Sequence, residues 1–535
     1  MSWLDAHLLT LVIFLPVVGG VLVALLPRGE GGQHKGVALV FSVTTFVASL
    51  PLWIGFHGKL AFEQKSEWAP TLGFSYHIGL DGVALLLFML TTFLGPIVVL
   101  SSWKFVQERV KEYCLAILLL ETAMLGTLAA LDLVLFYVFW EAMLIPMYLL
   151  IGMWGSERRI YAAVKFFLFT FVGSVLMLLA IFWLWSNSGP VGHRTFDYLE
   201  LLQSGAIDHE TQGWLFAAFC LAFAIKVPIW PLHTWLPDAH TEAPAAGSIL
   251  LAGVMLKMGT FGFIRYAMPL FPQAALEHAP FIATLGVVGI VYGSLMCMAQ
   301  TDLKRLIAYS SVAHLGFVML GLSALTREAV SGAVLQMVNH GISTGALFLM
   351  IGYLYERTHT RDLAAYGGVA TVAPAIAATF LVITLSSIGL PGTNGFVGEF
   401  LILIGTFTSH AVNHASLLSV VASTGVILGA VYMLWLYQRV FWGPARKAVQ
   451  HGLPDLTVRE WVTVAPLLVA IVWIGFQPQP LLNAIREPVD AFVERVVHPQ
   501  DDARKRADAL PPVDLMPRVV DAVQAAPAPQ EAEGK

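Results

Sequence analysis

Long runs of apolar residues, each about the length of a membrane-spanning helix, recur along almost the whole chain. A helix that crosses the hydrocarbon core of a bilayer needs about 20 mostly apolar residues. The runs are continuous and do not alternate with polar residues, which excludes a transmembrane β-barrel. The sequence therefore predicts an all-α polytopic membrane protein with about 14 transmembrane helices, at residues 4–26, 37–55, 80–101, 113–130, 132–152, 162–185, 213–236, 244–267, 280–299, 303–323, 328–355, 372–407, 415–440 and 460–478.

The composition agrees with a chain that lies mostly in lipid. Only 12% of the 535 residues are charged and 57% are hydrophobic, whereas an ordinary soluble domain carries about 25% charged residues. This excludes a soluble enzyme, a disordered protein and, with a net charge of −5, a nucleic-acid-binding protein. The three cysteines form no Cys-x-x-Cys motif, and no Walker or dinucleotide-binding glycine motif is present. We therefore expect no metal or cofactor site in this chain.

Lysines and arginines are distributed unevenly between the predicted loops. The even-numbered loops hold only Lys59, Lys65, Arg194 and Arg327, while the odd-numbered loops hold most of the rest, with Lys35 and Lys304 among them. Because cytoplasmic loops carry the excess of positive charge, both termini are expected on the periplasmic side of a bacterial inner membrane. The N-terminal run lacks a positively charged leader, so it is interpreted as a first transmembrane helix and not as a cleaved signal peptide.

Six ionisable side chains lie deep inside the predicted spans. A charge near the centre of a bilayer costs about 2.5–3.5 kcal/mol on insertion scales, and such residues are functional candidates by default. Buried lysines and histidines can exchange protons near neutral pH. We therefore predict a proton relay built from Glu141, Lys226, Lys257, His314, His340 and Glu399. The alternative for each residue is a structural ion pair or, for the histidines, a neutral side chain bonded to the backbone.

Two of these residues, Glu141 and Lys226, could set the direction of proton movement. While they are paired, the carboxylate holds the proton on the lysine; when they separate, the lysine releases it toward Lys257. The sequence contains no energy source for this separation. The drive must therefore come from an ion gradient or from partner subunits.

Other ionisable residues are weaker candidates. Five of them could form a secondary relay or a water entrance, with structural charges or loop caps as the alternative: Glu121, Lys165, His233, Asp238 and His240. Three more lie at span ends, where capping or snorkelling explains them: Asp81, Asp132 and Arg265.

Two predicted spans are interrupted by prolines and glycines, the seventh at Pro228 and Pro231 and the twelfth at Pro391 and Gly392. Broken helices at membrane depth mark ion sites in transporters. The two spans lie five apart, which predicts two inverted five-helix repeats, spans 4–8 and 9–13, each with a broken helix. The expected domains are an N-terminal three-helix segment (1–112), the first repeat (113–267), the second repeat (280–440), a last transmembrane helix (441–480) and a polar tail (481–535), amphipathic or extended at first and then disordered.

Several long motifs resemble those of a known family. They are FWEAMLIPMYLLIGMWG, YAAVKFFLFT, KVPIWPLHTWLPDAHTEAP, LKMGTFGFIR, DLKRLIAYSSVAHLGF and GLPGTNGFVGEF, spread over about residues 80–440. They resemble the antiporter-like subunits of respiratory complex I and of multi-subunit cation/proton antiporters. Three features favour the antiporter-like subunit of complex I that is neither L nor N. They are Glu399, where the L and N subunits typically have lysine, the end of the chain after fourteen spans, and the GSERRIYAAVKFF segment.

The resemblance implies a subunit of proton-translocating NADH:quinone oxidoreductase with no redox chemistry of its own. NAD, FMN, iron–sulfur clusters and quinone are expected in partner subunits. The neighbours would be the L and N subunits, small membrane subunits and the redox arm. By this resemblance, Glu141 and Lys226 form the coupling ion pair. Lys257, His314 and His340 form the central relay, and Glu399 is its terminal group. The alternatives are a subunit of a cation/proton antiporter, a subunit of a membrane-bound hydrogenase, and a non-transporting scaffold subunit.

Overall fold

The computed structural model describes residues 3–28, 31–190, 192–203, 207–449 and 452–498, and it is mostly helical. Its elements in chain order are α1 (Trp3–Leu25), α2 (Gly31–Ile54), β1 (Ala61–Ala69), η1 (Pro70–Leu72), β2 (Phe74–Leu80), α3 (Gly82–Ser101), α4 (Val110–Ala129), α5 (Leu133–Ala142), α6 (Leu144–Trp154), α7 (Arg159–Asn187), α8 (Tyr198–Gln203), α9 (His209–Lys226), α10 (Trp235–Glu242), α11 (Ala245–Leu250), η2 (Leu251–Met255), α12 (Leu256–Gly262), η3 (Phe263–Ala267), α13 (Met268–Leu270), α14 (Pro272–Met298), α15 (Leu303–Ala324), α16 (Arg327–Thr358), η4 (Leu363–Ala365), α17 (Val369–Val372), α18 (Pro374–Ser387), α19 (Asn394–Phe407), α20 (Ala415–Phe441), α21 (Val458–Phe476) and α22 (Gln479–Val497).

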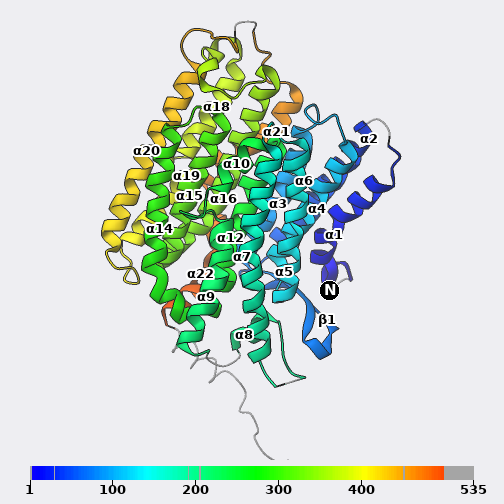
Figure 1. Ribbon diagram of the computed structural model, residues 1–535, viewed down its shortest axis with the longest axis vertical. Helices are drawn as coiled ribbons and strands as arrows, with labels where there is room; N and C mark the ends of the chain where they lie inside the picture. Colours follow the sequence, from blue (N-terminus) through cyan, green and yellow to red (C-terminus); the bar gives the residue numbers. More distant parts are fainter. Residues whose placement is uncertain (1–2, 29–30, 191, 204–206, 450–451, 499–535) are drawn as a thin grey trace, which may run out of the picture. The chain divides into compact units, whose positions relative to one another are not determined.

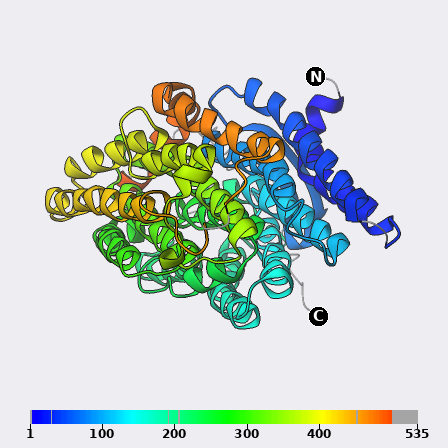
Figure 2. The same cartoon turned by 90° about the horizontal axis from the view of Figure 1, so that it is seen from above.

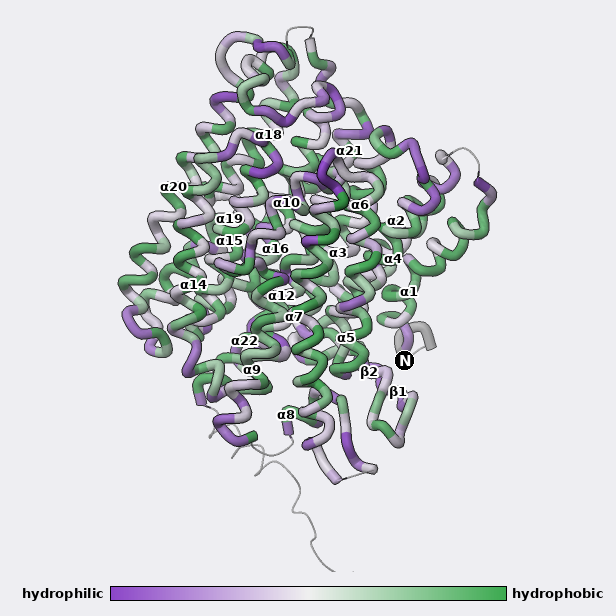
Figure 3. Tube along the Cα trace, viewed as in Figure 1, coloured by the Kyte–Doolittle hydropathy of each residue, from purple (hydrophilic) through white to green (hydrophobic). Residues whose placement is uncertain are grey.

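The membrane-spanning character of the chain is confirmed. Within the described residues, 12 helices are long and apolar enough to cross a membrane, and α18 and α19 are two shorter apolar helices. Apolar residues run along the helices, while polar residues gather toward their ends (Figure 3). The exact number of crossings, the inverted repeats and the domain boundaries stay predictions.

The two predicted helix breaks lie where prolines and glycines interrupt the sequence. The first separates α9 from α10 over residues 227–234, and the second separates α18 from α19 over residues 388–393. A proline removes a backbone donor and clashes with the preceding turn, and Gly389 and Gly392 adopt positive φ angles of 71° and 91°. Lys226 is therefore the last residue of the helix before the first break, and Glu399 lies one turn beyond the start of the helix after the second.

Burial is concentrated in three central helix runs. The apolar parts of Ala245–Leu270, Leu303–Ala324 and Arg327–Thr358 are completely buried, compared with 33% for Ala415–Phe441. Helices α1 and α2 lie at one edge of the bundle and α20 at the opposite edge (Figure 1), and the view from above agrees (Figure 2). The central runs carry Lys257, His314 and His340, so these groups are far from lipid.

The segment between α2 and α3 folds into a two-stranded antiparallel sheet that the all-α prediction did not include. In this sheet, β1 pairs with β2, and Gln64 lies opposite Ile78. Gly73 makes the turn between the strands with a φ of 69°, and an added Cβ there would lie 1.8 Å from the carbonyl oxygen of Arg194. Only glycine fits such a position. The hairpin was missed because its mixed polar sequence lies between two dominant apolar runs.

A cluster of charges around the buried His77 and Asp197 ties this hairpin to the segment before α8. His77 Nδ1 lies 2.6 Å from Asp197 Oδ2, and its Nε2 lies 2.9 Å from Glu63 Oε1. Lys65 Nζ lies 2.8 Å from the same Asp197 oxygen. Burial opposes the charge on His77, but the hydrogen bond and charge of Asp197 outweigh it and raise its pKa. Burial also opposes the Asp197 carboxylate, yet hydrogen bonds from His77 and Lys65 lower its pKa to about 2.

We expect this cluster to hold the hairpin most firmly between pH 3.8 and pH 6.5, the ordinary values for Asp and His. A raised histidine pKa adds stability that is complete below the unfolded pKa and is lost as pH rises through the folded one. A lowered aspartate pKa adds stability that is lost as pH falls toward 2. Hydrogen exchange of amides 61–80, corrected for its intrinsic rate, should accelerate above pH 6.5 by on the order of tenfold per unit of pKa shift. The same acceleration in His77→Gln would contradict the assignment.

The amphipathic prediction for the segment after the last span is supported up to residue 498. Helix α22 buries Leu481, Ile485, Val489, Phe492 and Val496, which are spaced three or four residues apart along one face. It packs against α16, α3 and α14. The predicted disorder of the rest of the tail falls on residues outside the described ranges.

The structure shows the partners of several charges near span ends. Capping is confirmed for Asp81, which accepts from Ala84 N, and for Asp132, which accepts from the amides of Val134 and Leu135 in the first turn of α5. Arg265, however, is not a snorkelling side chain, because its Nη2 lies 2.8 Å from Asp81 Oδ1. Lys304 was placed in a loop, but it is buried at the start of α15, where its Nζ donates to a backbone carbonyl at 2.5 Å.

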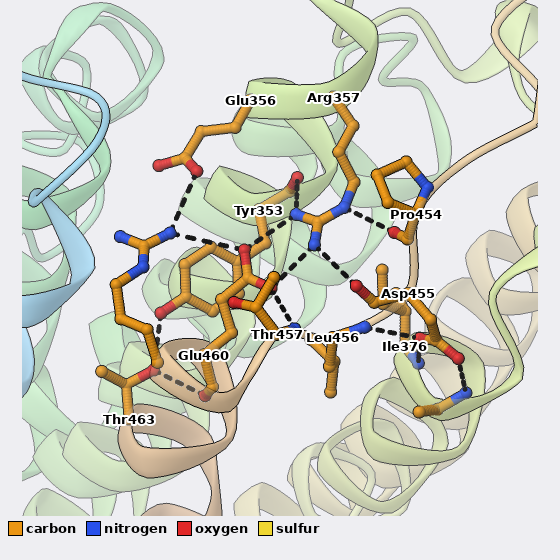
Figure 4. A network of polar contacts seen from close by, with 12 residues as sticks. Tyr353, Glu356, Arg357, Ile376, Pro454, Asp455, Leu456, Thr457, Glu460 and Thr463 are labelled. Carbon is orange, nitrogen blue, oxygen red and sulfur yellow. Dashed lines mark hydrogen bonds and ion pairs between the residues drawn. The ribbon is translucent and has the colours of Figure 1, made fainter.

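A network of arginines and carboxylates fastens α21 to the end of α16 (Figure 4). Arg357 donates from Nη2 and Nη1 to the two Glu460 oxygens, at 2.7 and 3.0 Å. Arg459 Nη2 lies 3.4 Å from both Glu356 and Glu460. Glu460, which is 2% exposed, also closes a capping box with Thr457 at the start of α21. Two parallel hydrogen bonds and burial distinguish the Arg357–Glu460 pair from an ordinary surface ion pair.

Replacing Arg357 with methionine is expected to cost about 3–5 kcal/mol of stability, since the change leaves a buried carboxylate without its main partner. Arg327→Met provides a matched control. Its pair with Asp490 is exposed, with side chains 68% and 36% accessible, and such pairs contribute about 1 kcal/mol or less. Thermal unfolding of both variants checks the difference. Equal losses of stability would show that the buried Arg357–Glu460 pair contributes no more than the exposed pair.

Candidate functional site

Lys257 lies in the first turn of α12, between the two π-helical turns η2 and η3. Its side chain is completely buried. Its Nζ donates to the carbonyl of Ala252 and lies 2.7 Å from His340 Nδ1. Turns of π-helix are rare and frequent at functional sites, and here they flank the lysine on both sides. Because an ammonium group can only donate, His340 Nδ1 accepts when Lys257 is charged.

The next two members of the site continue from His340 on α16. The rings of His340 and His314, the latter on α15, have centroids 5.7 Å apart. His314 Nδ1 lies 3.0 Å from Glu399 Oε1 on α19. Four of the six predicted relay residues therefore lie in one buried line, in the order Lys257, His340, His314 and Glu399, with direct contacts at both ends and no hydrogen bond between the two described histidines. This order was not predicted from the sequence.

The other two predicted relay residues, Glu141 and Lys226, lie on α5 and α9 and interact electrostatically. They are not in direct contact, because Lys226 Nζ has no hydrogen-bond partner among the described residues and lies 4.8 Å from the centroid of the Trp140 ring. The Glu141 side chain interacts with the hydroxyls of Tyr137 and Ser174. The structure therefore has the two charges near each other but separated.

A close contact between two helix backbones brings Lys226, at the first break, near Lys257 of the buried line. An added Cβ at Gly259 on α12 would lie 2.8 Å from the carbonyl oxygen of Phe223 and 2.9 Å from the amide nitrogen of Val227. The glycine therefore allows α12 and the end of α9 to approach each other closely. This contact lies two residues beyond Lys257 on one side and one residue beyond Lys226 on the other.

The weaker candidates divide into three groups. Lys165 Nζ pairs with Asp238 Oδ2 at 2.7 Å, and the ring of His233 packs on Tyr292 with centroids 5.1 Å apart. His240 stacks on an aromatic ring and lies within electrostatic range of Lys257, Lys304 and His340. Glu121 faces Gly95 of α3, and its oxygens have no hydrogen-bond partner in the described part of the chain. Of these five residues, His240 is the one within electrostatic range of the buried line.

Sequence reasoning missed a group of uncharged polar residues beside Glu399. Gln336 and Asn339 on α16 are buried, as are Ser386 and Asn394 at the second break. Gln336 Nε2 donates to Glu399 Oε1 at 3.1 Å. The spacing of Gln336, Asn339 and His340 at i, i+3 and i+4 on an apolar helix was the available signal, because such residues share one face.

Comparisons with known proteins agree with this geometry. Residues 130–428 match the family model described as NADH:quinone oxidoreductase/Mrp antiporter, TM. NADH-quinone oxidoreductase subunit M of Rhodobacter capsulatus is 46% identical over 502 residues, which cover 91% of this chain and 96% of that protein. A chain of respiratory complex I from Thermus thermophilus with bound NADH superposes with a TM-score of 0.83 at 34% identity and covers 91% of this chain and 99% of that one. A chain of the Mrp complex from Dietzia sp. has a TM-score of 0.79 at 20% identity, covering 94% and 99%, a likeness that shows the fold alone.

Proposed function

This chain belongs to the subunit M family of NADH–quinone oxidoreductase, and we propose that it carries protons across the membrane while other subunits transfer electrons from NADH to quinone. As a membrane subunit of that translocase, it contributes no redox chemistry of its own. Its task is therefore to move protons through a region from which bulk water is excluded, and buried groups that accept and release protons can do this.

The observation that carries the proposal is the alignment of Lys257, His340, His314 and Glu399 in one buried line. Lys257 and His340 are in direct contact, as are His314 and Glu399. One water molecule between the two histidine rings, whose centroids are 5.7 Å apart, would complete the line. Each group can hold a proton in one state and release it in the other. A purely structural role gives no reason for four titratable groups to adjoin one another in the most buried helices.

Glu141 and Lys226 fit the role of a coupling pair that feeds this line. When the pair closes, the carboxylate stabilises the charged lysine; when it opens, the lysine releases its proton more readily. We assign the open state to the arrangement in which Glu141 and Lys226 are separated. Trp140 offers its ring face to the Lys226 ammonium group, which stabilises a cation without binding its proton.

Further parts of the role follow from the family and from the charge pattern. We place the chain in a bacterial inner membrane with both termini on the periplasmic side, because the lysine- and arginine-rich loops then face the cytoplasm. The antiporter-like subunits L and N and small membrane subunits are its proposed neighbours. NAD, FMN, iron–sulfur clusters and quinone belong in other subunits of the complex.

Purification through an affinity tag on this chain tests the assignment. We expect the purified complex to oxidise NADH and to reduce quinone. After reconstitution into vesicles, it should acidify their lumen in sodium-free buffer when NADH is supplied outside. A protonophore should abolish the gradient, whereas a sodium ionophore should not. Recovery of a complex without NADH-oxidising subunits would contradict the assignment and would favour an antiporter or hydrogenase. A gradient that requires sodium would contradict proton transport.

A further inference from the structure

The carboxylate of Glu399 receives two hydrogen bonds at one oxygen. His314 Nδ1 lies 3.0 Å from Oε1, and Gln336 Nε2 lies 3.1 Å from the same atom. Gln336 reaches Glu399 across a glycine, since an added Cβ at Gly398 would lie 2.5 Å from Gln336 Oε1. The proton-accepting oxygen is thus held between a relay histidine and an amide that cannot itself exchange protons near neutral pH.

The orientation of the Gln336 amide is determined by its neighbours. Asn339 Nδ2 lies 2.7 Å from the backbone carbonyl oxygen of Asn394. A carbonyl oxygen can only accept, so the NH₂ end of Asn339 must face it. The same NH₂ group has a second proton, directed at Gln336 Oε1 at 3.5 Å. The oxygen end of Gln336 is thereby turned to Asn339, and its NH₂ end is left to face Glu399.

The carbonyl that determines this orientation lies at the second helix break. Asn394 is the first residue of α19, and Glu399 follows on the same helix. The oxygen of the Asn394 side chain accepts from Ser386 Oγ at 2.5 Å and from Ser343 Oγ at 3.3 Å. Its NH₂ group donates to the backbone carbonyl oxygen of Asn339 at 3.3 Å. These bonds join both sides of the break to α16. A movement at the break would therefore loosen the hydrogen bonds that orient Gln336.

We propose that Gln336 and Asn339 are positioning residues that keep a hydrogen-bond donor on Glu399 and so hold its carboxylate toward His314 for proton transfer. The inference rests on the proposed function, because it assumes that Glu399 accepts a proton from the relay. Through Asn394, the donor is present only while the second break keeps its present conformation. The side-chain amides of Asn394, Asn339 and Gln336 thus make proton acceptance by Glu399 dependent on the conformation of the broken helix.

Two substitutions in the assembled complex test the roles of the Gln336 and Asn339 side-chain amides. Gln336→Met keeps the length of the side chain and removes the donor, and Asn339→Leu removes the group that orients Gln336. We expect NADH-driven proton pumping to fall about tenfold in the first variant, which loses a hydrogen bond to a charged group, and less in the second. Thr406→Val is the matched control, because Thr406 is buried on α19 and its hydroxyl has no partner among the described residues.

Infrared difference spectroscopy separates positioning from structural damage. The carboxylate band of Glu399, identified by its loss in Glu399→Gln, should shift in Gln336→Met and Asn339→Leu and stay unchanged in Thr406→Val. An unmoved band in Gln336→Met, at any pumping rate, would overturn the inference but leave the relay intact. Full pumping by Glu399→Gln would instead overturn the role of Glu399 in the proposed function, and this inference with it.

Discussion

Replacing Lys257 with methionine is expected to reduce NADH-driven proton translocation about 100-fold or more, while the complex still assembles. The lysine is the first group of the buried line and the direct partner of His340. Groups that transfer protons typically contribute about 10²–10⁴-fold to a rate. Methionine has nearly the same length and is apolar, so it fills the same space without a proton to exchange. Proton uptake by reconstituted vesicles, with the quantity of assembled complex measured in parallel, checks this expectation.

The matched control is Lys35→Met, which removes another buried lysine. Lys35 donates to the carbonyls of Trp103 and Val106, and no member of the relay is among these partners. It was placed in a loop by the sequence, and its burial in α2 corrects that assignment. Its loss should lower stability and leave the pumping rate of each assembled complex near normal. A similar loss of pumping in both variants would mean that Lys257 acts through folding alone.

The second large effect is expected at Glu141. Glu141→Gln removes the charge that can hold a proton on Lys226 but keeps the size of the side chain. Without this partner, Lys226 is left with only the Trp140 ring as a described cation partner, so the proposed opening and closing of the pair no longer controls its proton. We expect pumping to fall on the order of 10–100-fold, measured as the initial rate of acidification.

Glu121→Gln is the corresponding control for a buried carboxyl group. Glu121 is 1% exposed, faces Gly95 of α3 and makes no hydrogen bond to the described residues of the line. Its replacement should change the pumping rate less than twofold. If the Glu121 variant lost as much activity as the Glu141 variant, Glu121 would belong to the relay.

The candidate relay residues could be predicted because lipid makes every buried charge costly. Lys226, Lys257 and Glu399 stand out from apolar runs on that basis alone. The helix breaks were likewise predictable, since proline and glycine act on the backbone within a few residues. These signals are local, and they do not depend on how the helices pack.

The contacts between these residues could not be predicted, because they depend on the relative height and rotation of different helices. Nothing in the sequence places Lys257 against His340 or leaves Glu141 and Lys226 apart. The pair of Arg265 with Asp81 was missed for the same reason. Gln336 and Asn339 carry no charge, so the argument from the cost of burial did not single them out.

The most direct test of the central claim is the number of protons translocated per NADH oxidised by complexes that carry His340→Leu. His340 is the only described residue that contacts Lys257 on one side and faces His314 on the other, so its loss interrupts the line at its centre. The account predicts either a lower ratio of protons to NADH in the assembled variant or the loss of NADH oxidation and pumping together. Native values of both the oxidation rate and the ratio would contradict it.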